Sequence, residues 1–132
     1  DRQVDLIESV QKIRSKHNIN IAVFGHAGDG NLHVNIMHHR KDPAESKRAR
    51  EGLGELMKAV IDLGGAISGE HGVGLAKSPF LPLQLNQAEI GAMKKVKEAL
   101  DPNGILNPGK IFEPFEVWDR EKENYRFPWD HR

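Results

Sequence analysis

The sequence predicts an α+β fold, in which a partly antiparallel sheet carries helices on one face. Three observations lead to this prediction. Apolar residues at helical spacing alternate along the chain with short, β-branched runs. Two of those runs are separated by a glycine-rich segment that suits a hairpin. With 38% hydrophobic and 29% charged residues, the 132-residue chain has the composition of one globular domain.

The first expected element is a helix that stops near residues 16–18. Leu6, Val10 and Ile13 recur at helical spacing and leave charged residues for the opposite face. Because this pattern is already under way at Asp1, we expect the chain to be part of a longer protein.

A hairpin is expected next. Residues 19–24 form a short apolar run, and residues 32–37 form a second run with apolar side chains at alternate positions. Residues 25–31 between them contain three glycines, which favours a tight connection. His33 and Asn35 should then share one face of the second strand, opposite its apolar side chains.

A longer helix is predicted over residues 43–63. Asp42 can cap its start, and Pro43 suits its first turn. The apolar stripe consists of Ala49, Leu53, Leu56, Met57, Val60 and Ile61. The residues expected to face solvent are Glu45, Lys47, Arg48, Arg50 and Glu51. Two glycines at 64 and 65 end this helix.

The rest of the chain is predicted to hold a very short strand at residues 66–68 and one more helix. Residues 86–89 read Asn-Gln-Ala-Glu, which resembles a capping box, and the helix should reach about Leu100. Its inward residues are predicted to be Ile90, Met93, Val96 and Leu100. Turns are expected at residues 101–104 and 107–110. Residues 113–132 have no clear period and are interpreted as an extended tail.

Charge and composition exclude several classes of function. Nineteen basic residues balance nineteen acidic ones, so the chain has no net positive charge that would attract nucleic acid. The absence of cysteine excludes disulfide scaffolds, thiolate zinc sites and cysteine catalysis. Without a targeting signal, we expect a cytoplasmic location, with membrane association through a partner left open.

The histidines and glycines indicate a metal site. His26 ends the first strand and His33 lies in the second, so a tight hairpin would bring both imidazoles to one end of the sheet. Glu70 lies in the glycine-rich segment 69–74 and is the obvious third ligand. Two imidazoles and one carboxylate form a ligand set that suits zinc, manganese or iron. His71 would be a base beside the metal. Any one of these histidines alone is more often a hydrogen-bonded structural residue.

Three ordered motifs resemble the C-terminal domain of FAD-linked oxidases of the vanillyl-alcohol oxidase type. They are residues 24–35 (FGHAGDGNLHVN), 68–74 (SGEHGVG) and 101–112 (DPNGILNPGKIF). The closest branch looks like the glycolate oxidase FAD subunit, D-lactate dehydrogenase and D-2-hydroxyglutarate dehydrogenase. The resemblance covers residues 24–112 and does not extend to the tail.

The resemblance implies a role for seven residues of this chain. His26, His33 and Glu70 match divalent-metal ligands, for zinc or manganese, and His71 matches the base that takes the hydroxyl proton. Asn35, with the two ligand histidines, matches the substrate-contacting set. Asn107 and Lys110 lie in the motif that packs near the flavin.

The resemblance also implies partners. The substrate is a small 2-hydroxy acid, such as glycolate, D-lactate or D-2-hydroxyglutarate, oxidised at C2 with hydride transfer to FAD. A flavin-binding domain outside this chain would hold FAD, so residues 1–112 form a substrate- and metal-binding domain, a fragment of a larger flavoenzyme that is inactive by itself. The resemblance leaves open whether an iron–sulfur subunit accepts the electrons and whether the protein forms a homo-oligomer.

Two other functions are consistent with the residues. A free-standing metal-dependent hydrolase would use the same His/His/Glu site, with His71 activating water. A non-catalytic interaction module would use the tail, through Trp118 and Trp129, with the histidines merely structural. Lys77, His17 and His131 are interpreted as surface residues.

Overall fold

A computed structural model of the chain describes residues 2–113. The chain divides into two compact units, the first Asp1–Gly69 and the second Glu70–Arg132. The predicted aromatic tail, with Trp118 and Trp129, lies outside the described residues, as does His131. Within the described part, no helix is long and apolar enough to cross a membrane.

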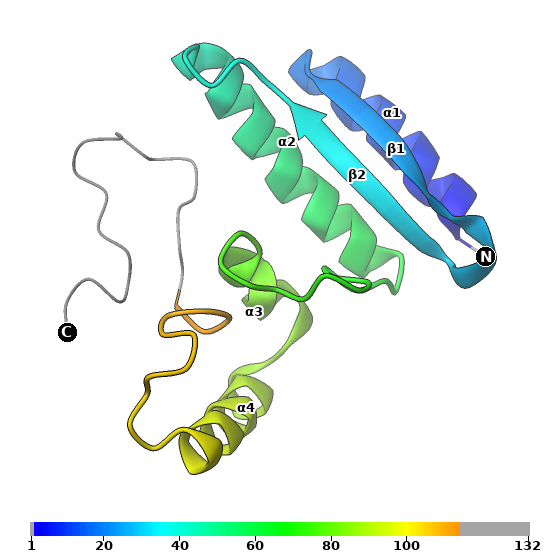
Figure 1. The fold of residues 1–132 in the computed structure, drawn as a ribbon. Helices are drawn as coiled ribbons and strands as arrows, with labels where there is room; N and C mark the ends of the chain where they lie inside the picture. The colour runs from blue at the N-terminus through cyan, green and yellow to red at the C-terminus, as the bar shows by residue number, and fades with distance from the viewer. Residues whose placement is uncertain (1, 114–132) are drawn as a thin grey trace. The chain divides into compact units, whose positions relative to one another are not determined.

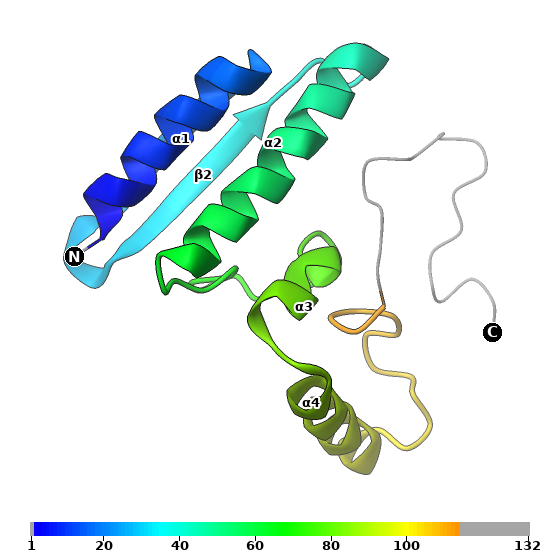
Figure 2. The same cartoon turned by 180° about the vertical axis from the view of Figure 1, so that it is seen from behind.

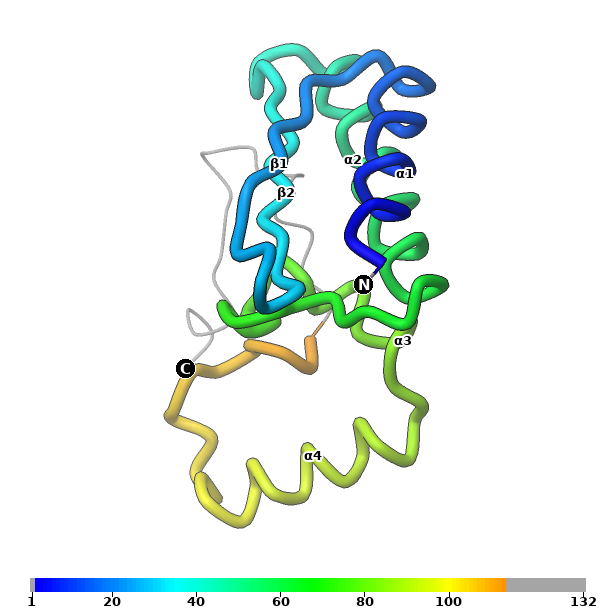
Figure 3. The backbone as a smooth tube through the Cα atoms, turned by 90° about the vertical axis from the view of Figure 1, so that its right-hand side faces the viewer, coloured from blue at the N-terminus to red at the C-terminus, as the bar shows by residue number. Residues whose placement is uncertain are grey.

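The first unit is a hairpin with two helices, in the order α1 (Gln3–His17), β1 (Asn20–His26), β2 (Asn31–Met37) and α2 (Pro43–Asp62). Figures 1 and 2 show α1 and α2 running alongside the two strands. Seen from the side, both helices lie on the same face of the hairpin (Figure 3). The predicted α+β class, with helices on one face of an antiparallel sheet, is therefore confirmed.

The strands pair antiparallel, and their register decides which side chains share a face. Val23 lies opposite Val34, and Phe24 lies opposite His33. Paired residues point to the same side of a hairpin, and neighbours along a strand alternate between its two sides. Val23 and Val34 pack against the core that the helices contribute to, so the two valines face the helices. Phe24 and His33 consequently lie on the face that the helices leave open.

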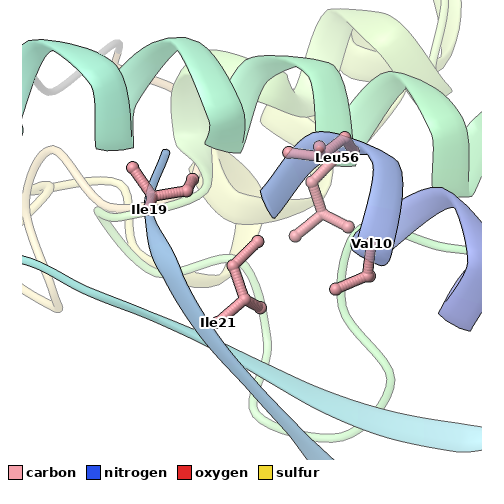
Figure 4. Packing of buried hydrophobic residues seen from close by; sticks show 5 residues of the cluster. Val10, Ile19, Ile21 and Leu56 are labelled. Atoms are coloured by element: carbon pink, nitrogen blue, oxygen red, sulfur yellow. The ribbon is translucent and has the colours of Figure 1, made fainter. Parts of the chain in front are cut away.

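The core of the first unit forms where β1 meets the two helices. Val10 and Ile13 come from α1, Ile19 immediately precedes β1, Ile21 lies in β1, and Leu56 comes from α2. Their packing is shown in Figure 4. Helical spacing predicted the contributions of α1 and α2, and the short apolar run at residues 19–24 predicted a buried strand at β1.

The ends of α1 and α2 follow from local chemistry. The Asp42 side chain accepts hydrogen bonds from the backbone N–H groups of Ala44 and Glu45, as predicted for a cap. At the end of α1, Asn18 takes the left-handed conformation, with φ 49°, and stops the helix. His17, predicted to be a surface residue, is only 12% exposed at its side chain, because it lies against Glu55 of α2.

The second unit contains η2 (Ser78–Phe80), α3 (Leu81–Gln84) and α4 (Gln87–Leu100). The predicted capping box is present at the start of α4. Asn86 accepts from the N–H of Glu89, and the Glu89 carboxylate accepts from the N–H of Asn86. Residues 78–84 carried no prediction, since their prolines and short length obscure any period.

Two expectations for this part of the chain are wrong. Residues 66–68 form no strand, because they join no sheet: within the described residues the sheet consists of β1 and β2 alone. On α4, Ile90 is buried as predicted, but Val96 is 60% exposed and Leu100 78% exposed. Helical periodicity identifies which side chains share a face, whereas burial needs an element to cover that face, and none of the described residues covers this one.

Candidate metal and substrate site

The turn of the hairpin brings the two predicted ligand histidines together. His26 is the last residue of β1 and lies opposite Asn31, the first residue of β2. His33, two positions further along β2, points to the same face. The two imidazole rings are 5.7 Å apart between centroids, in an edge-to-face arrangement.

Glycine is required where the strands enter this turn. Gly25 has a φ of 156°, and a Cβ at this position would lie 2.3 Å from the carbonyl oxygen of Asn31. Gly30, after the short 3₁₀ turn η1 (Ala27–Asp29), adopts the left-handed region with φ 71°. These glycines allow the close approach that holds His26 and His33 at one end of the sheet.

Glu70, the third predicted ligand, directly follows Gly69, the last residue of the first unit. A Cβ on Gly69 would lie 2.3 Å from the Asn31 side-chain oxygen, so the backbone at Gly69 passes directly beside the hairpin turn. Glu70 is the next residue along the chain. One potential ligand atom from each of His26, His33 and Glu70 lies within 4.8 Å of the other two.

This donor set fits a divalent metal ion. Two imidazole nitrogens and one carboxylate oxygen are ligands that zinc and manganese accept, and they leave coordination positions for a substrate. His26 and Glu70 are exposed and His33 is half-buried, so a small molecule could reach the group.

His71 lies beside the same carboxylate. Its Nε2 is 3.4 Å from Oε1 of Glu70, and the imidazole is exposed to solvent. A histidine in this position can exchange a proton with a molecule held at Glu70.

Asn35 extends the site along β2. It lies two residues beyond His33 on the same strand, so both side chains share the open face of the hairpin. Asn35 is exposed, and its partner across the hairpin is the small residue Ala22. The Asn35 amide is therefore accessible to a ligand.

Phe24 is part of this face although sequence reasoning assigned it no role. Its ring stacks on that of His33, with centroids 5.1 Å apart and planes inclined by 30°, yet its residue surface is 55% exposed. The signal that could have found it is the hairpin register, which places Phe24 directly opposite His33.

Asn107 and Lys110, predicted from the resemblance, contact each other. The Lys110 ammonium donates to the side-chain oxygen of Asn107 at 2.8 Å. The N–H of Ile111 donates to the carbonyl of Gly74 at 2.8 Å, which ties this segment to the glycine-rich loop that begins at residues 69–70. Lys77, predicted to be a surface residue, is half-buried, and this burial lowers the pKa of its ammonium group.

Comparisons with known proteins cover most of the chain. The family model "FAD linked oxidases, C-terminal domain" matches residues 1–111. The glycolate oxidase subunit GlcD of Bacillus subtilis is 44% identical over 108 residues, which are 82% of this chain and 23% of the relative.

Two further relatives have related names. The D-2-hydroxyglutarate dehydrogenase of Stutzerimonas stutzeri is 42% identical over 80% of this chain and 24% of its own length. A mitochondrial D-lactate dehydrogenase [cytochrome] of Saccharomyces cerevisiae is 40% identical over 69% of this chain and 15% of its own length. The chain thus spans at most about a quarter of the curated relatives named here.

Proposed function

Because the chain belongs to the family of C-terminal domains of FAD-linked oxidases, we propose that it is the metal- and substrate-binding part of an FAD-dependent oxidoreductase. The reaction is the oxidation of the C2 hydroxyl of a small 2-hydroxy acid to a keto group. The observation that carries this proposal is the convergence of His26, His33 and Glu70, with His71 adjacent.

We propose that His26, His33 and Glu70 bind a divalent metal, zinc or manganese, together with the substrate. A metal bound there would supply Lewis acidity that lowers the pKa of the C2 hydroxyl. Asn35 donates its amide hydrogens to the substrate carboxylate from the same open face. His26 and His33 would also contact the substrate, because a small molecule held at this metal would lie close to both rings.

His71 is the proposed base of the reaction. It lies beside Glu70 without belonging to the ligand group, so its imidazole can accept the C2 hydroxyl proton while the substrate stays bound. FAD, when bound, supplies the acceptor for the hydride that leaves C2. Asn107 and Lys110 would contact the flavin from the segment that is tied to the glycine-rich loop.

In this proposal, FAD is held by a part of the enzyme outside this chain. We propose that residues 1–112 complete a larger protein whose other part holds FAD, because the relatives are about four times longer than their matching region. The substrate class follows the relatives' names, which refer to glycolate, D-lactate and D-2-hydroxyglutarate. A metal-dependent hydrolase is not favoured, because these relatives are oxidoreductases.

Calorimetric titration of the chain with Zn²⁺ and Mn²⁺ tests the metal site. His26→Ala, His33→Ala and Glu70→Ala should each weaken binding by more than about tenfold, since each removes one ligand. His39→Ala is the matched control, because His39 is an exposed histidine outside the group. Equal affinity in the wild type and all four variants would contradict the proposal.

Flavin absorbance of the complete enzyme tests the reaction. Anaerobic addition of glycolate, D-lactate or D-2-hydroxyglutarate should bleach a bound flavin with at least one of them. In His71→Ala the bleaching should slow while metal affinity stays unchanged, since His71 is not a ligand. A complete enzyme without flavin would contradict the oxidoreductase proposal.

A further inference from the structure

A cavity lies at the opposite end of the hairpin from His26 and His33. It has a volume of about 470 Å³ and opens between the end of α1, the start of β1 and the first turns of α2. In the hairpin register this is the end where Asn20 pairs with Met37, whereas His26 pairs with Asn31 at the other end. The cavity shares no residue with the metal and substrate site and lies entirely within the first unit.

Arg48 is the unusual residue of this cavity. Helical periodicity predicted that it faces solvent, but it is half-buried, and its Nε is completely buried without a hydrogen-bond partner among the described residues. A buried N–H of a charged group is unfavourable unless an acceptor meets it. The Nε itself is closed to solvent, but Arg48 lines the cavity, so an anion held there can pair with the guanidinium group after a small shift of the side chain.

The other lining residues also present hydrogen-bond donors. Arg14, on the helix that faces Arg48, adds a second guanidinium group. Ser15 and Asn18 add a hydroxyl and an amide, and Asn20 lines the cavity at the start of β1. Donors thus reach this cavity from α1 and from the residue that follows it, together with Arg48 on α2.

One carboxylate, that of Glu45, also lines the cavity. Its Oε2 accepts a hydrogen bond from the backbone N–H of His39, at 2.9 Å, so part of its accepting capacity is already used. Two arginines against this one glutamate leave a net charge of +1. A ligand that fits must therefore be an anion, and a protonated oxygen on it would suit the remaining Glu45 oxygen.

We propose that this cavity, the Arg14–Arg48 cavity, binds a phosphate group, either free or as a monoester. The oxygens of a phosphate point in four directions, so they can accept from guanidinium groups on two different helices at once. A simple carboxylate has only two oxygens in one plane, which a single guanidinium already satisfies. The cavity volume leaves room for the organic part of a monoester.

Nuclear magnetic resonance of the full chain tests this site, with the Arg48 Nε–H signal as the main readout. Inorganic phosphate should shift that signal and the amide signals of Asn18 and Asn20 in a saturable way. Potassium chloride at the same ionic strength should not. Glycerol phosphate as a second probe distinguishes the two sources, because a site for monoesters binds it more tightly than inorganic phosphate.

Three variants make the outcome decisive. Arg14→Gln, at an exposed position, should weaken phosphate binding by roughly tenfold, and Arg48→Gln should weaken it at least as much. Lys47→Gln is the control, because it removes the same charge from an exposed neighbour on α2. The proposal is overturned if chloride reproduces the shifts, if the Arg48 signal does not respond to phosphate, or if Lys47→Gln weakens binding as much as Arg14→Gln.

Discussion

Single residues in the hairpin decide whether the candidate site can form. His26 and His33 come from different strands, and their rings meet only because the turn between them is tight. Gly25 permits the close approach of the strands, and Phe24 packs against the ring of His33. All of these contacts lie within the hairpin, so the hairpin fixes how the two imidazoles lie relative to each other.

Gly25→Ala should damage both stability and metal binding. The new Cβ would meet the Asn31 carbonyl oxygen at 2.3 Å, and this oxygen belongs to the backbone and cannot rotate away. We expect a loss of about 2 kcal/mol or more in the free energy of unfolding, measured in urea. Gly28→Ala is the control, since nothing lies within 4 Å of its Cβ position; an equal loss there would contradict the steric argument.

Phe24→Leu should weaken metal binding without unfolding the chain. Leu keeps an apolar side chain on the open face but removes the ring that stacks on His33. Such a stack contributes about 0.5–1.5 kcal/mol, so metal affinity should fall by roughly two- to tenfold in calorimetry. Phe24→Tyr keeps the ring and should restore wild-type affinity. If Tyr binds as weakly as Leu, ring stacking is not what orients His33.

At the scale of elements, α1 contacts α2 through hydrogen bonds between ionisable side chains as well as through the apolar core. The Glu55 carboxylate of α2 accepts hydrogen bonds from Lys16, at 2.8 Å, and from His17, at 2.9 Å, both near the end of α1. These two hydrogen bonds hold the pKa of Glu55 below its ordinary value of 4.5. The contact explains why His17 is not the surface residue that the sequence suggested.

This contact should make stability depend on pH in the acid range. Because the pKa of Glu55 is lower in the folded chain than in the unfolded chain, its contribution is complete above about pH 4.5 and is lost as the pH falls through the lowered folded value. Urea unfolding at several pH values should therefore show a weaker acid dependence in Glu55→Gln than in the wild type. The control Glu8→Gln, at an exposed position of α1, should keep the wild-type profile.

At the scale of the whole molecule, apolar side chains are distributed very differently in the two units. The first unit has a continuous core in which Leu56 is 2% exposed. In the second unit, the apolar stripe of α4 remains open beyond Ile90, although Asp101 accepts hydrogen bonds from the N–H groups of Ile105 and Leu106 and so orders the turn that follows. Exposed apolar faces of this kind are typical of domains that pack against another part of a protein.

Leu56→Ala and Leu100→Ala measure this difference directly. Truncation of Leu56 leaves a cavity in the core and should lower the free energy of unfolding by about 2–5 kcal/mol. Leu100 is 78% exposed, and its truncation should change that free energy by less than about 0.5 kcal/mol. A loss at Leu100 comparable to that at Leu56 would show that the α4 stripe is covered in solution.

Much of the fold could be predicted because its signals are local. The cap at Asp42, the capping box at Asn86 and the spacing of Val10 and Ile13 each depend on neighbours within a few residues. The candidate site was predicted differently. The expected tight hairpin suggested that His26 and His33 share one end of the sheet, but the choice of Glu70 relied on residue type and on motif resemblance.

The sequence by itself determined the α+β class, the order of helices and strands, and the identity of the candidate ligands, because residue types and their periodicity carry that information. Only the tertiary structure decided that Gly69 passes beside Asn31, that Phe24 stacks on His33, that Arg48 is half-buried, and that α4 leaves Val96 and Leu100 exposed. The physical reason is that these outcomes depend on contacts between segments distant in sequence. A local pattern predicts which side chains share a face, and the rest of the fold determines what that face meets.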